Sequence, residues 1–269
     1  MPSTHRIESS IGGTPVNAYL IEGERQVVVV DSTLTVSGGR AVRQQVVDTG
    51  KPLSAIVLTH AHPDHYGGAI EVMAGSDAPI VAAAGVDEVI RRDDPLKEEI
   101  LRPMFGDEWP RERAFPTQVL EDGAELSFGD IELRLRDLGP GESHHDTMWL
   151  LSDGKIVFSG DQAYNHMHCY LADGRWEEWL TNIESLTAGL EPEAVLHVGH
   201  GDPAGPGLLA WQRDYIGHFV DAVRMADWSD DIRAQEEVAA SMGDFLTTAD
   251  LRFLMELSIE PVATKLGVR

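Results

Sequence analysis

Residues 59–68 read Thr-His-Ala-His-Pro-Asp-His-Tyr-Gly-Gly, a stretch with three histidines and one carboxylate within six positions. The apolar run at residues 55–58 just before it is short and flanked by hydroxyl side chains, which predicts a buried strand. On an extended segment, residues i and i+2 face the same side. His60 and His62 can therefore bind one cation together.

The residues that follow this pair add further candidate ligands. Pro63 suits the first turn of a helix, because its fixed φ is already helical and its missing N–H is not needed there. That turn would direct Asp64 and His65 toward a second metal position. Neutral imidazoles together with a carboxylate are common zinc ligands, and iron or manganese accept them as well.

Two later runs end in residues of the same chemical kind. The β-rich segment 155–158 is followed by Asp161, and the segment 194–198 is followed by His200. In layered α/β proteins, ligands collect at the carboxyl ends of strands. The predicted strands therefore bring histidine and aspartate to one edge, which indicates a metal site there.

These motifs resemble those of the metallo-β-lactamase superfamily. Three segments carry the likeness: residues 59–68 resemble its metal-binding motif, Ser159-Gly160-Asp161 its bridging-aspartate motif, and Gly199-His200-Gly201 its final histidine. The runs at 20–23 and 27–30, followed by Asp31, resemble its opening strands, which end in an aspartate near the metals. The likeness spans about residues 5–223.

The resemblance implies an α/β fold, the four-layer αββα sandwich, and two divalent metal ions, with zinc preferred and iron or manganese as alternatives. The metal ligands that it implies are His60, His62, Asp64, His65, Glu142, Asp161 and His200. Lactonases, thioesterases, β-lactamases, sulfatases, nucleases and oxygenases share these motifs. The resemblance therefore implies the family and leaves the substrate open.

One ligand position departs from the usual pattern. Most members carry His-Thr-x-Gly before the bridging aspartate, whereas residues 139–147 read Gly-Pro-Gly-Glu-Ser-His-His-Asp-Thr. Aligning on the strand expected at 148–151 places Glu142 at the third ligand of the first metal, as the alkylsulfatase branch similarly does. A shift of the loop would bring His144 or His145 there instead. These alternatives and an unfilled position all remain open.

A glutamate at this position would change the charge of the site. Asp64, Asp161 and Glu142 would bring three negative charges against the four positive charges of two divalent ions. A bridging hydroxide would neutralise the remaining charge, whereas a histidine in place of the glutamate would leave one positive charge. A neutral site is a weaker Lewis acid and favours harder ions such as iron or manganese.

Composition narrows the class of partner. The 269 residues carry a formal net charge of −24, which argues against nucleic-acid binding, since that needs surfaces rich in lysine and arginine. The single cysteine, Cys169, excludes an internal disulfide. Residues 1–10 lack the pattern of a secretion signal, and no apolar run reaches the roughly 18 residues of a membrane span. We expect a cytoplasmic protein that acts on a small molecule, in an oligomeric state that the sequence does not indicate.

The pattern along the chain predicts one domain over residues 1–269, in which 227–269 form a C-terminal helical extension. Strand signals lie at 4–31, 80–83, 117–120, 124–137 and 146–158, and helices are expected at 39–49, 70–74, 86–92, 174–190 and 205–226. The extension should contain two helices over 231–266, with a break near 242–244. It would either complete the core or form an oligomer contact.

Residues 95–118 are expected to form a long loop, because several prolines and a glycine interrupt them. Met104, Trp109 and Phe115 are large apolar side chains in this segment. Long loops of this kind often cover a ligand pocket. The segment would therefore either form a lid over an apolar part of the substrate or only cover the core.

Tyr164 lies three residues after Asp161, the spacing at which lactonases of the superfamily similarly carry a tyrosine. The resemblance implies that its hydroxyl steadies a carbonyl oxygen of the substrate, although a packing role fits the spacing equally well. His166 and His168 would either line the pocket or pack near it. His197 is expected to support the site or to pack beneath it.

Together these residues predict a two-metal hydrolase. Two ions about 3.5–4 Å apart would share a water and lower its pKa, with Asp161 between them and Asp64 orienting the resulting hydroxide. The hydroxide would attack the carbonyl of a lactone, ester or thioester, while one metal and Tyr164 stabilise the oxyanion. Asp64 and Tyr164 are thus the predicted catalytic residues.

Three other functions remain open. Glu142 suggests a sulfate-ester hydrolase, although the chain lacks room for the extra domains of alkylsulfatases. A mononuclear iron dioxygenase of the persulfide type would need only two histidines and one carboxylate, and it would contain one iron per chain. A non-catalytic small-molecule binding protein of the same fold would hold metal and ligand without turnover.

Overall fold

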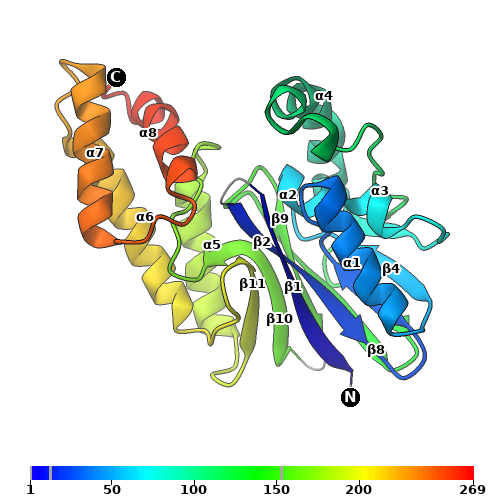
Figure 1. Ribbon diagram of the computed structural model, residues 1–269. Coiled ribbons are helices and arrows are strands. Elements are labelled where there is room, and N and C mark those ends of the chain that lie inside the picture. Colours follow the sequence, from blue (N-terminus) through cyan, green and yellow to red (C-terminus); the bar gives the residue numbers. More distant parts are fainter. Residues whose placement is uncertain (1, 12–13, 152–153) are drawn as a thin grey trace.

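The computed structural model describes residues 2–11, 14–151 and 154–269. Within them the chain forms two β-sheets, with helices on the outer side of each (Figure 1). The predicted layered αββα architecture is therefore confirmed. Among the described residues, no helix is long and apolar enough to cross a membrane.

The first sheet has the strand order β1-β2-β3-β4-β5-β6. Its strands are β1 (Ser3–Ile11), β2 (Thr14–Glu22), β3 (Val27–Val30), β4 (Leu53–Val57), β5 (Ile80–Ala83) and β6 (Gln118–Leu120). From β3 to β6 the strands pair in parallel. All four valines of β3 are buried, because helices and the second sheet cover both faces of a parallel sheet.

The second sheet has the order β11-β10-β9-β8-β7. Its strands are β7 (Glu125–Phe128), β8 (Ile131–Gly139), β9 (Asp146–Leu151), β10 (Ile156–Tyr164) and β11 (Val195–His200). The strand signals at 124–137 and 146–158 therefore each contain parts of two strands, which pair antiparallel. Gly129 has a φ of +63° and forms the turn between β7 and β8, a conformation that glycine adopts without strain.

The helices are α1 (Val36–Asp48), α2 (Pro63–Tyr66), α3 (Ala69–Val72), α4 (Ala84–Phe105), the short 3₁₀ helix η1 (Gly106–Glu108), α5 (Trp176–Gly189), α6 (Leu208–Met225), α7 (Asp231–Phe245) and α8 (Arg252–Leu266). In Figure 1, α1, α3 and α4 lie on the side of the first sheet, and α5 to α8 lie on the side of the second. The predicted break in the C-terminal extension falls later than expected, at residues 246–251.

Two apolar cores hold these layers together. The first fills the space between the sheets and under α1 and α4, and it includes Ile56 of β4 and Trp149 of β9. The second lies between the outer face of the second sheet and α5 to α8. Because Met255 and Val262 of α8 are fully buried in this second core, the C-terminal helices pack against the domain.

The prediction of a loop at 95–118 is wrong for the first half of this segment, because α4 continues to Phe105. Two prolines lie inside this helix, and each removes a backbone donor and tends to bend a helix. Arg102 compensates at the C-terminal end by donating to three carbonyl oxygens of residues 106–110, at 2.5 to 2.9 Å. Tertiary hydrogen bonds of this kind outweigh local propensity.

The large side chains of this segment mostly cover the core. Trp109 is fully buried, and its Nε1 donates to Oε2 of Glu98 at 2.7 Å. Phe115 packs against the first core. Met104 is 63% exposed on α4. A lid over the substrate therefore stays a prediction, and the buried tryptophan favours the core-covering interpretation.

Candidate metal centre

All seven predicted metal ligands lie together at the ends of the strands. They form two groups, and within each group the ligand atoms lie within 4.8 Å of one another: His60, His62, Glu142 and Asp161 in the first, and Asp64, His65 and His200 in the second. Five of these side chains are buried, and those of His62 and Asp64 are nearly so.

Each sheet contributes to both groups. The segment after β4 and the short helix α2 carry His60, His62, Asp64 and His65, whereas Glu142 lies in the turn between β8 and β9, Asp161 in β10 and His200 at the end of β11. Helix α2 starts at Pro63, as predicted from the fixed φ of proline. An isolated β-bridge between His60 and Asp146 joins the two halves of the site.

Asp161 is the carboxylate that lies between the two groups. Its Oδ2 is 3.8 Å from Nε2 of His60 in the first group and 3.1 Å from Nε2 of His200 in the second. Its Oδ1 is 3.4 Å from Nε2 of His65. One carboxylate thus faces ligand atoms of both groups, which is the geometry that a bridging ligand requires.

Buried polar atoms without partners show that the cluster fits metal ions. Among the described residues, Nε2 of His60 and His65, Oε2 of Glu142 and Oδ1 of Asp161 are buried and have no hydrogen-bond partner. Buried polar groups are normally hydrogen-bonded, because an unpaired one costs about 1–3 kcal/mol. Nitrogen and carboxylate donors that converge in this way are suited to zinc, iron or manganese.

The turn between β8 and β9 presents Glu142, and not a histidine, to the first group. Oε2 of Glu142 lies 3.0 Å from Nδ1 of His62 and 3.6 Å from Nε2 of His60. His145 instead contacts Asp137, with Nε2 and Oδ1 2.8 Å apart. The structure thus favours Glu142 over His145 as the third ligand.

The same turn holds His144 outside the group as well. Its Nε2 is 3.9 Å from Oδ2 of Asp173, on the outer side of the cluster. The buried carboxylate of Asp146 fixes the turn, because it accepts hydrogen bonds from the backbone N and Oγ of Ser143 at 3.0 and 2.9 Å. No role was predicted for Asp146 itself, so its place in this turn is an addition to the predicted site.

Tyr164 contacts two side chains of the cluster. Its hydroxyl donates to Oε1 of Glu142 at 2.9 Å, and its ring stacks on His200 with 4.9 Å between centroids. The side chain is fully buried. The hydroxyl hydrogen is therefore engaged by a protein carboxylate, and the tyrosine holds Glu142 in place.

A further layer of contacts orients the imidazoles. Asp31 accepts from Nδ1 of His65 at 2.8 Å and from the hydroxyl of Thr59 at 2.8 Å. Nδ1 of His200 lies 2.5 Å from the carbonyl oxygen of Pro15. Such contacts fix which ring nitrogen carries the proton and leave the other free for a metal. The expectation that Asp31 lies near the site agrees with this geometry.

The remaining histidines singled out in the sequence lie outside the cluster. His197 packs edge-on against Tyr19, and burial lowers its pKa to about 4. His166 stacks on Trp211, and Nδ1 of His168 contacts the hydroxyl of Tyr215 at 3.0 Å. These histidines therefore have packing roles, and the described contacts give none of them a place in the site.

The charges within the cluster compensate one another. Burial lowers the pKa of a histidine, but Asp161 and Asp64 outweigh it at His200 and raise its pKa to about 10. For Glu142, burial raises the pKa to about 8, against the opposing effect of His62. The carboxylates thus balance His200, whereas burial disfavours the charged form of Glu142 unless a cation lies beside it.

Gly199 has no side chain, and this leaves room for the carboxylate of Asp161. A Cβ at this position would lie 1.8 Å from Oδ1 of Asp161 and 2.8 Å from Cε1 of His65. A second glycine, Gly160, has a φ of +51°, and a Cβ there would lie 2.6 Å from Oγ1 of Thr59. Close approach of neighbouring atoms thus requires glycine at both of these positions.

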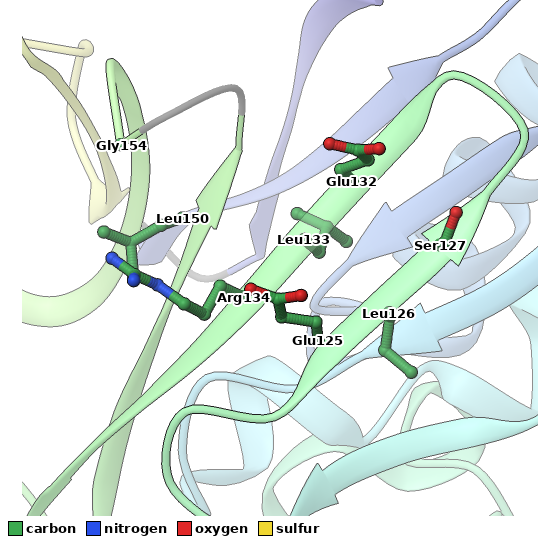
Figure 2. Close-up of a pocket in the computed structure, with 8 residues that line it drawn as sticks. All are labelled: Glu125, Leu126, Ser127, Glu132, Leu133, Arg134, Leu150 and Gly154. Carbon is green, nitrogen blue, oxygen red and sulfur yellow. The ribbon is translucent and has the colours of Figure 1, made fainter.

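Two surface hollows lie at different distances from the cluster. One of about 420 Å³ lies on β7, β8 and β9 and is lined by none of the seven residues (Figure 2). Its polar lining includes Glu125, Glu132 and Arg134. A much smaller hollow is lined by Asp64 together with Thr35 and other residues near β1 and β2. Only the second one borders the metal centre.

The metallo-β-lactamase superfamily model matches residues 11–208. The chain belongs to this superfamily. A probable metallo-hydrolase of Bacillus subtilis, YqgX, is 25% identical over 193 residues, which cover 71% of this chain and 87% of that protein. A hydroxyacylglutathione hydrolase of Bdellovibrio bacteriovorus is 26% identical over 148 residues, covering 55% of this chain and 49% of its own length.

Solved structures agree with this superfamily membership. A metallo-β-lactamase family protein from Thermus thermophilus has a TM-score of 0.69 at 19% identity, covering 98% of this chain and 94% of that one. At this identity the likeness shows the fold alone. The superfamily match and the named relatives identify the protein as a metal-dependent hydrolase.

Proposed function

We propose that this protein hydrolyses an ester-like bond of a small molecule, namely a lactone, ester or thioester, with two divalent metal ions. The observation that carries the proposal is the position of Asp161, whose two oxygens face ligand atoms of both groups. The first ion would be held by His60, His62, Glu142 and Asp161, and the second by Asp64, His65, Asp161 and His200.

Two bound ions would supply a water of lowered pKa and positive charge for the developing oxyanion. Asp64 is suited to orient that water. The side chain of Asp64 is 18% exposed, whereas that of Asp161 is 2% exposed. Asp64 also lines the small hollow beside the site. Its Oδ2 lies 3.3 Å from Nε2 of His200, which keeps the carboxylate directed at the cluster.

Tyr164 acts in this proposal through Glu142. A neutral phenol that donates to Oε1 leaves Oε2 free for the first metal and removes part of the negative charge of Glu142. The buried location of both side chains strengthens this hydrogen bond. We therefore place Tyr164 beside the catalytic site as a positioning residue, and its single hydroxyl hydrogen serves Glu142 in place of the substrate carbonyl that the resemblance implied.

Metal analysis and a substrate panel test the proposed function. Freshly purified protein should contain close to two transition-metal ions per chain by mass spectrometry, and it should turn over at least one of a lactone, an ester and a thioester. Chelation should abolish the turnover, and added zinc, manganese or iron should restore it. Two ions without turnover of any of these substrates would reject the proposed reaction in favour of a binding protein.

A sulfate-ester hydrolase is the second candidate, and the contact of Glu142 with His62 supports it, since the alkylsulfatase-like pattern carries a glutamate at this position. A secondary alkyl sulfate in the same panel separates the two candidates. One iron per chain with oxygen consumption would instead indicate the dioxygenase alternative.

Replacement of Glu142 tests its place in the first group. Glu142→Ala should lower the metal content toward one ion per chain and remove most of the hydrolytic rate, since Oε2 faces His60 and His62. Glu142→His should keep two ions and shift the preference toward zinc, because an imidazole replaces a hard carboxylate. Metal counts by mass spectrometry decide this.

His144→Ala and His145→Ala are the matched controls for this prediction. Both side chains belong to the same turn but contact Asp173 and Asp137 instead of the cluster. Both variants should keep two ions. If either of these variants loses an ion while Glu142→Ala keeps two, the turn presents a histidine to the metal and not Glu142.

A further inference from the structure

Asp173 contacts His62 on the side away from the metal group. Oδ2 of Asp173 lies 3.4 Å from Nε2 of His62, while Nδ1 of the same ring lies 3.0 Å from Oε2 of Glu142. The side chain of Asp173 is only 15% exposed. Tyr170 packs edge-on against the His62 ring, with 5.3 Å between centroids.

We propose that Asp173 is a positioning residue that orients His62 for the first metal, an inference that rests on the proposed function. A carboxylate on Nε2 keeps the ring proton on that nitrogen. Nδ1 is then left with its lone pair directed toward Glu142, where the metal would bind. Carboxylate partners of this kind fix the tautomer of a ligating histidine and raise its basicity.

The turn that carries Asp173 is held by the C-terminal helix α8. The backbone N of Leu171 donates to Oγ of Ser258 at 2.8 Å, and Ser258 is fully buried. Lys265 donates from Nζ to the carbonyl oxygen of Gly174. The turn is tight, since Gly174 has a φ of +68° and its N donates to the carbonyl oxygen of Leu171 at 2.9 Å.

A continuous set of contacts therefore leads from α8 through the turn 171–174 and Asp173 to His62. Helix α8 lies beyond residue 208, where the superfamily match ends. The C-terminal extension thereby gains a role at the metal centre, in addition to its place in the second core. We infer that α8 sets the affinity of the first metal site by holding the turn.

The first test removes the carboxylate. Asp173→Ala should weaken the binding of one ion by about 10- to 100-fold, the range for loss of a partner of a ligating histidine, and leave the other ion unchanged. Asp173→Asn should recover most of this affinity, because its amide oxygen can still accept from Nε2. Metal content after equilibration with graded chelator measures both affinities, and Asp77→Ala, an exposed aspartate, is the control.

The second test removes the support from α8. Ser258→Ala should weaken the binding of the same ion several-fold. Thr264→Ala should not, because the hydroxyl of Thr264 donates to the carbonyl oxygen of Glu260 in its own helix at 2.9 Å. Lys265→Met provides a second variant in case Ser258→Ala lowers stability, which thermal unfolding will show. In an Asp173→Ala background, Ser258→Ala should cause no further loss, since coupled residues are not additive.

The outcomes separate this inference from the proposed function. If the wild-type protein binds two ions and Asp173→Ala binds both with unchanged affinity, the positioning role is overturned and the proposed function stays intact. Additive losses in the double variant overturn the link between α8 and Asp173. Wild-type protein that binds no ion overturns the proposed function and this inference together.

Discussion

His60→Ala and His200→Ala are each expected to lose hydrolytic activity by at least about 100-fold, because even a 1 Å misplacement in a site can cost this much. Each imidazole directs a buried Nε2 at the cluster, and His200 lies 3.1 Å from the central Asp161. The metal content should fall in both variants. Activity assays and metal analysis on the same preparations measure this.

The fold should survive these two substitutions. Both histidines lie just beyond or at the end of a strand, and the apolar cores are built from other residues. Circular dichroism and thermal unfolding should therefore resemble those of metal-free wild type. His5→Ala, at an exposed histidine of β1, should keep both activity and metal. Wild-type turnover by His60→Ala or His200→Ala would reject the site.

Gly199→Ala should be almost as damaging as removal of a ligand, although it adds only a methyl group. The new Cβ would overlap Oδ1 of Asp161 at 1.8 Å, and both β10 and β11 are fixed by their parallel pairing. Either Asp161 must rotate away from the cluster or β11 must shift. We expect loss of bound metal, a lower melting temperature and a rate at least about 100-fold lower.

Gly205→Ala is the matched control, because a Cβ at Gly205 would meet no heavy atom within 4 Å. It lies shortly after β11 in the same part of the chain. It should keep metal, activity and melting temperature. If Gly199→Ala behaves like this control, the close approach of Asp161 to the strand is not a feature of the protein in solution.

Several candidate ligands could be proposed from the sequence because they have short-range signals. His60 and His62 follow from the i, i+2 geometry of an extended segment, and Pro63 marks the start of α2. Asp161 and His200 follow from their places at the ends of apolar runs. The family resemblance supplied the layered architecture, which the pattern of strands and helices alone would not specify.

The parts that the sequence could not predict depend on distant contacts. Asp173 reaches His62 across 111 positions of sequence, so no local motif marks it. The hydroxyl of Tyr164 donates to Glu142, and spacing alone cannot distinguish this from a hydroxyl that faces the substrate. Helix α4 passes through its prolines because Arg102 and the packed core hold it, and local propensity favours a break.

The division of the ligands between the two sheets has a consequence for the folded state as a whole. His60 and His65 come from one half of the chain, and Asp161 and His200 come from the other. On the proposed function, an ion bound between them acts as a reversible cross-link that exists only in the native state. By mass action, free metal at about 100 times its dissociation constant would add about 2.7 kcal/mol to the free energy of unfolding. The lifetime of this protein would then follow the metal supply of its surroundings.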